Sequence, residues 1–163
     1  MFSKLKDYLT RYDRDEEQLR KEQETTDEQV KVSFAALFVE AASADDEYTS
    51  KERALILTLL KHQLKIDDEE ALKLRSIGES AQARAHDLHR FTRDVKLIPE
   101  DQRGEFVENL WRIILLDEVR DPFEDALMRR LCGLIYLSDR QSAEARLRVQ
   151  ARMDAKDTPP QKA

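Results

Sequence analysis

Two clusters of acidic residues, 72 positions apart, are the residues here whose types and spacing could do chemistry. Each cluster follows an apolar run, FAALFVEAASA or FVENLWRIILL, with two consecutive acids and a glutamate seven residues after the first acid. The clusters are Asp45, Asp46 and Glu52 in the first acidic elbow (residues 45–52), and Asp117, Glu118 and Glu124 in the second (residues 117–124). Because Ca²⁺ and Mg²⁺ prefer carboxylate oxygens, these residues are candidate ligands for a divalent cation.

The apolar runs predict the helices that position the acids. Phe34, Phe38 and Ala41 recur at helical spacing, and the next position on that stripe is Asp45. Each elbow therefore places a carboxylate near a helix C-terminus, where the helix dipole disfavours an anion. Such acids need a compensating cation. The residues leave open whether it is a bound metal or nearby basic side chains, namely Lys51, Arg53, Arg112 and Arg120.

The glutamate of each elbow also has a purely structural interpretation. Thr49-Ser-Lys-Glu52 has the form of a capping box at the start of a helix. Asp121-Pro-Phe-Glu124 likewise offers a cap, a proline at the first helical position and a glutamate at the third. Since a cap stabilises a helix by about 1 kcal/mol, capping alone could explain both glutamates.

An internal repeat sets the expected fold. At an offset of 72 the identical pairs are Phe34/Phe106, Asp45/Asp117, Glu52/Glu124, Ala54/Ala126, Leu55/Leu127, Leu59/Leu131 and Asp67/Asp139. We predict an all-α compact bundle of about seven helices, built from two related helical-hairpin halves that bring the elbows together. Helices are expected at 26–44, 50–64, 67–78, 81–97, 99–116, 122–135 and 138–153.

The two ends of the chain are predicted to lie outside this bundle. Residues 1–28 read as an amphipathic helix over 1–12 followed by a charged linker, residues 29–153 form the helical domain, and residues 154–163 form a disordered tail. Whether the N-terminal helix docks on the domain, on a partner or on a membrane surface stays open.

Composition narrows the function classes. A net charge of −6 argues against nucleic-acid binding, and a single cysteine, Cys132, fits a reducing compartment. Without an apolar run of bilayer length or a signal-peptide pattern, we expect a cytoplasmic protein. No phosphate loop, nucleophile elbow or HExxH motif is present, so we expect neither an enzyme nor a small-molecule substrate.

The elbows resemble the TerB-like family, in which an Ala-Asp with following acids ends an apolar helix and a Glu follows seven residues later. The resemblance covers residues 30–150 and includes Leu110-Trp111 and the LIYLSD stretch ending at Asp139. The family comprises tellurite-resistance proteins and the N-terminal domain of a membrane-anchored DnaJ-type co-chaperone. The resemblance implies a stress-response role and a divalent metal at Asp45, Glu52, Asp117 and Glu124. The family's glycine after each motif aspartate is replaced by Asp46 and Glu118, and this chain has no J domain.

A basic stretch is the second candidate site. Arg84, His86, His89, Arg90 and Arg93 are candidate residues for binding an acidic protein partner, and the alternative is an ordinary solvated helix face. His86 and His89 would share one helix face. Two hypotheses follow: a non-enzymatic module that binds a divalent cation, Ca²⁺ or Mg²⁺, at the paired elbows, or a protein-interaction scaffold whose elbows are only helix caps.

Overall fold

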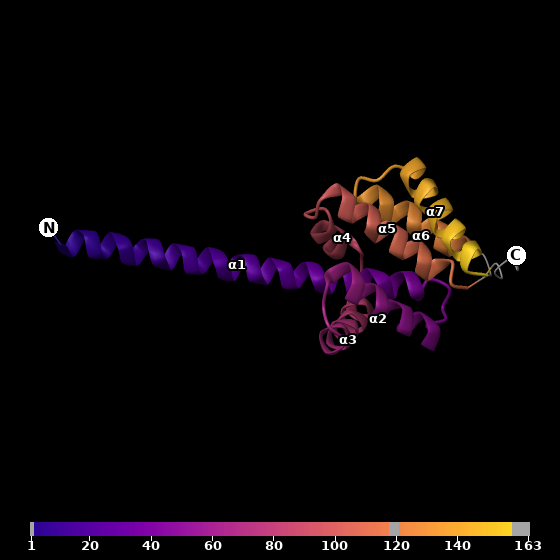
Figure 1. Cartoon of the computed structure of the whole chain (residues 1–163), viewed down its shortest axis with the longest axis horizontal. Helices are drawn as coiled ribbons and strands as arrows, with labels where there is room; N and C mark the ends of the chain where they lie inside the picture. The colour runs from indigo at the N-terminus through magenta and orange to yellow at the C-terminus, as the bar shows by residue number, and fades with distance from the viewer. Residues whose placement is uncertain (1, 118–120, 158–163) are drawn as a thin grey trace, which may run out of the picture.

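The protein is all-helical over the residues that the computed structural model describes, 2–117 and 121–157 (Figure 1). The helices in this part of the chain are α1 (Phe2–Ala42), α2 (Ser50–Leu64), α3 (Asp68–Arg84), α4 (His89–Val95), α5 (Glu100–Ile114), α6 (Pro122–Leu134) and α7 (Asp139–Asp157). The predicted all-α fold of about seven helices is confirmed. Among these described helices, none has both the length and the apolar character that crossing a bilayer requires.

Helix α1 is far longer than predicted. It is one continuous helix, and its residues 2–28, which we call the shaft, project from the bundle as a straight rod (Figure 1). The predicted helix start near residue 26 is therefore wrong. Residues 14–28, which read as a solvated helix or a flexible connection, are helical, and they contain no Gly or Pro to end a helix. Thr26 does not cap a new helix; its hydroxyl instead donates to the Glu22 carbonyl at 2.9 Å, one turn earlier.

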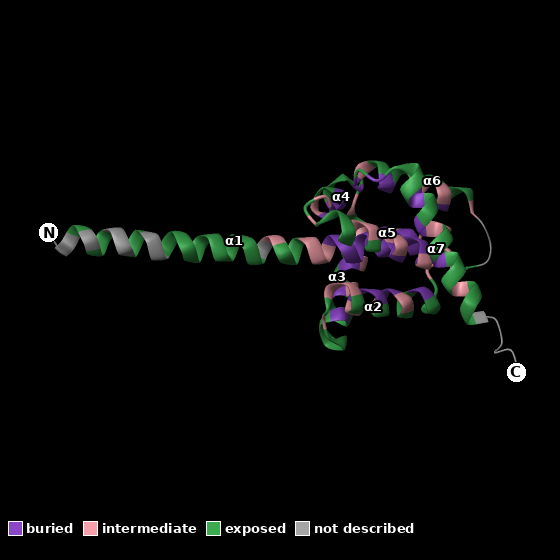
Figure 2. Cartoon of the chain, turned by 45° about the horizontal axis from the view of Figure 1, so that its top comes forward, coloured by how far each residue is buried: buried purple, intermediate pink, exposed green. Residues whose placement is uncertain are grey.

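The core forms where the C-terminal part of α1 meets α5, and buried residues concentrate there (Figure 2). The ring centroids of Phe34 and Phe106, an identical pair of the repeat, lie 4.8 Å apart edge to face. Phe38 stacks on Phe106 at 5.4 Å. Contact between equivalent residues is what a pseudo-two-fold arrangement of the two halves requires, and it orients the ends of α1 and α5 toward the same region.

Helix α3 packs closely against α1 through a glycine. A Cβ added at Gly78 would lie 2.6 Å from the Cβ of Ala35, so only glycine allows this approach. The sequence predicted a break near Gly78, but α3 continues to Arg84. The break comes later, where the Asp87 carboxylate accepts the His89 N–H at 2.9 Å and begins α4.

After α2 and α6, the offset between equivalent residues of the two halves falls from 72 to 71. Each of these helices is followed by a left-handed residue, Lys65 (φ 53°) and Tyr136 (φ 61°), which are 71 positions apart. Helix α7 is capped by Ser138, whose hydroxyl accepts the Gln141 N–H at 3.1 Å. Asp139, paired with Asp67 in the sequence comparison, is therefore not the structural equivalent of that cap. Helix α7 runs to Asp157, past the predicted start of the tail, and residues 158–163 lie outside the described residues.

Candidate functional site

The first acidic elbow begins with a tight turn at the end of α1. The Asp45 carboxylate accepts the Glu47 N–H at 3.1 Å, and Asp46 takes a left-handed conformation with φ 62°. This is where the resemblance places a glycine, which adopts positive φ at no steric cost. Aspartate is one of the few other residues that adopt this conformation, so the turn survives the substitution.

The first elbow ends in a complete capping box. Glu52 Oε2 accepts the Thr49 N–H at 2.9 Å, while Thr49 Oγ1 accepts the Glu52 N–H at 3.2 Å. Glu52 is buried, and this burial raises its pKa. The hydrogen bonds with Thr49 act in the opposite direction, and the charges of Asp45 and Asp117 raise the pKa further.

The second elbow lacks this reciprocal box. The Asp121 carboxylate accepts the N–H of Phe123 at 2.8 Å, so Asp121 and Pro122 start α6 as predicted. The Glu124 N–H donates instead to the Asp121 carbonyl, at 3.1 Å. Within the described residues, the Glu124 carboxylate has no hydrogen bond, and capping does not account for it. The remaining predicted member of this elbow, Glu118, lies outside the described residues.

Glu124 is the most perturbed acid of the elbows. It is only 5% exposed, and burial raises its pKa to about 7. The next contributions come from like charges, in decreasing order Asp45, Asp121, Asp117 and Asp125. Asp45 belongs to the first elbow and Glu124 to the second. In the same way, the charge of Asp117 in the second elbow raises the pKa of Glu52 in the first. The fold thus brings the two elbows within electrostatic range of each other, as the repeat predicted.

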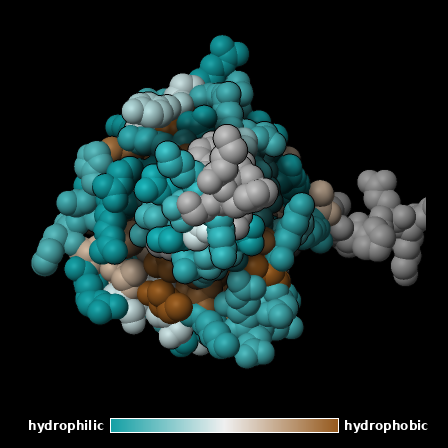
Figure 3. All heavy atoms as spheres, turned by 90° about the vertical axis from the view of Figure 1, so that its left-hand side faces the viewer, coloured by the Kyte–Doolittle hydropathy of each residue, from teal (hydrophilic) through white to brown (hydrophobic). Residues whose placement is uncertain are grey.

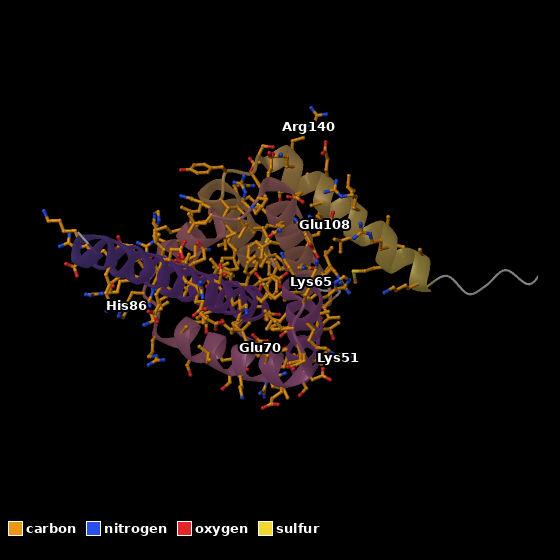
Figure 4. All side chains as sticks on the ribbon, turned by 60° about the vertical axis from the view of Figure 1, so that its left-hand side comes forward. Lys51, Lys65, Glu70, His86, Glu108 and Arg140 are labelled. Carbon is orange, nitrogen blue, oxygen red and sulfur yellow. The ribbon has the colours of Figure 1, made fainter. Side chains whose placement is uncertain are left out.

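The basic residues expected to neutralise the elbows do not do so among the described residues. Arg53 lies 3.9 Å from Glu79 of α3 and places its guanidinium 5.9 Å from the ring centre of Tyr48. Lys51 is exposed at the start of α2 (Figure 4), Arg120 is outside the described residues, and neither Lys51 nor Arg112 pairs with a described acid. Among the described residues, none of these basic side chains forms an ion pair with Asp45, Glu52, Asp117 or Glu124.

Metal ligation is not preformed. Among residues 2–117 and 121–157, no three His, Cys, Asp or Glu side chains already stand close enough to hold one ion. The chemistry of the donor set fits a hard cation, since it consists of carboxylates near the C-termini of two helices. Glu52 already uses one carboxylate oxygen in its cap, whereas the Glu124 carboxylate is uncommitted. Binding would require these side chains to close around the ion.

Several residues near the elbows were missed by the sequence analysis. Asp121, which was expected only as a cap, and Asp125 add negative charge around Glu124, as their position beside it in the sequence could have indicated. Tyr48, in the first elbow, is half-buried, and burial followed by the Glu79 charge raises its pKa to about 12. Its hydroxyl has no hydrogen-bond partner among the described residues, which no sequence pattern reveals.

The predicted partner site is brought together only in part. His86 is not on a helix but in the loop before α4, near α1 (Figure 4), so the predicted shared helix face with His89 is wrong. Arg84, His86 and Arg90 line a hollow of about 630 Å³ floored by apolar residues of α1, α3 and α4. Arg93 lines the adjoining hollow beside α1, and His89 lines neither.

The remaining candidates are structural. Cys132 is fully buried, and this burial raises the pKa of its thiol, as expected for an inert core cysteine. Trp111 lies in the core and donates from Nε1 to the Ser142 hydroxyl at 3.1 Å.

This architecture defines the class of protein: an all-α helical module whose two acidic elbows lie within electrostatic range of each other. The family model described as tellurite resistance protein TerB matches residues 31–147, so the chain belongs to the TerB family. The resemblance read from the elbows is thereby confirmed. Comparison with curated proteins finds no match, and comparison with solved structures finds none either.

Proposed function

We propose that this TerB-family protein is a non-enzymatic, stress-response-type module that binds a divalent cation between its two acidic elbows. The observation behind the proposal is Glu124, a buried carboxylate with like charges around it and no hydrogen bond or ion pair among the described residues. An uncompensated buried charge is costly unless it is protonated or meets a cation. Near neutral pH, Glu124 is poised between these two outcomes.

The residues best placed to hold the ion come from both halves. Glu124 and Asp117 supply carboxylates without a hydrogen bond among the described residues. Asp45 supplies a carboxylate that already accepts the Glu47 N–H, and Glu52 borders them. Asp46 is exposed beside Asp45 and could complete the oxygen ligands of Ca²⁺ or Mg²⁺, together with water. Because the ligand form of Glu124 is deprotonated, binding releases its proton and strengthens as the pH rises through about 7.

Thermal unfolding of the EDTA-treated protein tests the proposal directly. At fixed ionic strength, one of Ca²⁺, Mg²⁺, Mn²⁺ or Zn²⁺ is expected to raise Tm. An ion at 100 times its dissociation constant adds about 2.7 kcal/mol, a shift of several degrees for a chain of this size. The Asp45→Asn/Asp117→Asn variant should lose this shift.

A matched variant controls for the loss of charge. Asp101→Asn/Glu105→Gln also removes two carboxylates, but at the opposite end of α5 from the second elbow. It should keep the full metal response. A shift that persists in the elbow variant, or no shift with any ion, would rule out this site.

A second candidate is a protein-interaction scaffold whose elbows are structural. It is favoured by the hollows beside α1, where Arg90 and Arg93 form no ion pair with a described residue. An acidic segment of a partner would complement them. This candidate predicts the opposite outcome of the same experiment: indifference to every metal, with the Asn variant folded.

A further inference from the structure

A hollow between α5 and the C-terminal part of α7 differs in charge from the hollows beside the shaft. At the base of the shaft, where apolar surface gathers (Figure 3), the hollows have mixed charge, because Glu28, Asp87 and Asp94 line them together with arginines. In the hollow beside α7, every charged lining residue is basic, and we call it the cationic hollow. It has a volume of about 350 Å³, and its lining residues are Arg112, Val149, Arg152, Met153, Ala155 and Lys156.

The cationic hollow depends on the full length of α7. All but one of its lining residues belong to the part of α7 between residues 149 and 156. The match to the TerB family ends at residue 147, whereas α7 continues to Asp157. This hollow is therefore built mainly by a part of the chain that the family match does not include.

The walls of the cationic hollow combine apolar groups with positive charge. Val149 is buried, Met153 is half-buried and Ala155 is exposed. Arginine and lysine side chains add their methylene groups to such a surface while their charged ends stay in water. The volume of the hollow lies within the range of small-molecule sites. A ligand that fits it has both an apolar part and a negative charge.

The positive charge around the hollow is only partly balanced within the described residues. Glu108 of α5 accepts hydrogen bonds from Arg148 at 2.8 Å and from Arg152 at 3.0 Å (Figure 4). The two arginines together lower the pKa of this carboxyl group, although its burial acts in the opposite direction. Arg112 and Lys156 form no ion pair with a described residue. A bound anion would supply the missing negative charge.

We propose that the cationic hollow binds a phosphate monoester that carries an apolar substituent. Arginine binds phosphate through two parallel N–H groups, and lysine binds it as a point charge. Arg112 and Lys156 contact the phosphate group, and Glu108 holds Arg152 in position beside them. The substituent lies against Met153. A phosphate monoester carries about two negative charges at pH 7, so it matches two uncompensated cations better than a carboxylate does.

Isothermal titration calorimetry in EDTA tests the proposal with octyl phosphate as the probe. The unaltered protein should bind octyl phosphate. Inorganic phosphate lacks the apolar chain, octanoate carries less negative charge, and octyltrimethylammonium is a cation. Each of these three should bind at least about tenfold more weakly than octyl phosphate. No binding of octyl phosphate, or equal binding of any of the three, would overturn the proposal.

Two substitutions on α7 locate the site. Ala155→Asp adds a negative charge to the lining of the hollow and should weaken the binding of octyl phosphate at least about tenfold. Ala151→Asp adds the same group at an exposed position of the same helix outside the hollow, and it should leave binding unchanged. Both variants should keep the circular dichroism of the folded helices. If the two variants bind octyl phosphate alike, the ligand does not occupy this hollow.

Vesicles that contain phosphatidic acid distinguish a lipid source of the phosphate from a soluble one. If a lipid headgroup is the source, the unaltered protein sediments with these vesicles and Ala155→Asp does not. Binding of octyl phosphate without binding of vesicles assigns a soluble ester. Ala155→Asp should keep the full metal response of the elbows, so this proposal and the cation proposal can fail independently of each other.

Discussion

The two acidic elbows follow one sequence plan but treat their glutamates differently. In the first elbow, Glu52 and Thr49 satisfy each other through two hydrogen bonds. In the second, Asp121 caps the N–H of Phe123, and the Glu124 carboxylate has no hydrogen bond within the described residues. Both glutamates are equally buried, yet only the pKa of Glu124 rises to about 7. Burial alone therefore does not set the difference; the hydrogen-bond partners and neighbouring charges do.

Another partly buried acid, Glu108 on α5, shows the effect of compensation (Figure 4). Its burial raises the pKa, but hydrogen bonds from Arg148 and Arg152 of α7, at 2.8 and 3.0 Å, outweigh burial and lower it. Glu108 is thus a structural acid that joins two helices. Glu124 has like charges around it instead of arginines, and its pKa is raised.

The largest expected effect comes from replacing Glu124. The pKa of Glu124 rises from its ordinary value of 4.5 to about 7, so the folded state binds a proton more tightly than the unfolded state. Stability of the metal-free protein should therefore fall as pH rises from 4.5 to 7. The full shift corresponds to about 3 kcal/mol, and screening by solvent at the carboxyl group reduces this amount. Glu124→Gln does not titrate and should be the more stable protein at pH 8, by up to this amount. Urea unfolding of both proteins across this pH range measures it.

Glu52→Gln is the matched control for that experiment. It alters the same residue type at the equivalent position, but it weakens a formed capping box, so it should not stabilise the protein at pH 8. If Glu52→Gln and Glu124→Gln behave alike, the contrast between the elbows is lost.

Removing either of the two helix caps should change the free energy of unfolding by a smaller amount. Thr49→Ala removes one half of the capping box and should destabilise the protein by about 1 kcal/mol. Asp121→Ala removes a cap as well, but it also removes a charge that raises the pKa of Glu124. At pH 8 this relief offsets part of the loss, so Asp121→Ala should cost less than Thr49→Ala. At pH 4, where Glu124 is protonated, the two costs should converge.

Local pattern predicted the elements of this fold well, because caps and apolar stripes are local. The Thr49 and Asp121 caps, the apolar faces leading to Asp45 and Asp117, and the pairing of the halves followed from spacing alone. The ends of the helices were harder to predict from the sequence. The sequence around residues 14–28 lacks an apolar face, and such polarity suits an exposed helix as well as a linker. Gly78 looked like a break because its role, contact with Ala35, lies in another helix.

The sequence could nominate residues for the candidate site, but it could not show the difference between the two elbows. The repeat identified Asp45, Glu52, Asp117 and Glu124 and implied that the elbows meet. It could not show that the Glu124 carboxylate stays outside its cap, since Thr49 and Asp121 both read as good capping residues. Nor could it show that Arg53 turns to Glu79 and Tyr48 and leaves Asp45 without a basic partner among the described residues. Those outcomes depend on distances between helices.

The smallest expected effect concerns the turn of the first elbow. Asp46 holds φ 62°, a conformation that glycine adopts freely and that costs other residues energy. Asp46→Gly should therefore stabilise the protein, by about 0.5 kcal/mol after the entropy lost by glycine, whereas Asp46→Ala should destabilise it. Chemical denaturation compares the three proteins with metal removed. If calcium or magnesium then stabilises Asp46→Gly as much as the unaltered chain, the ion depends on Asp45 and the second elbow rather than on the Asp46 carboxylate. A weaker response would make Asp46 a ligand and explain why an acid stands at a position that the turn itself would give to glycine.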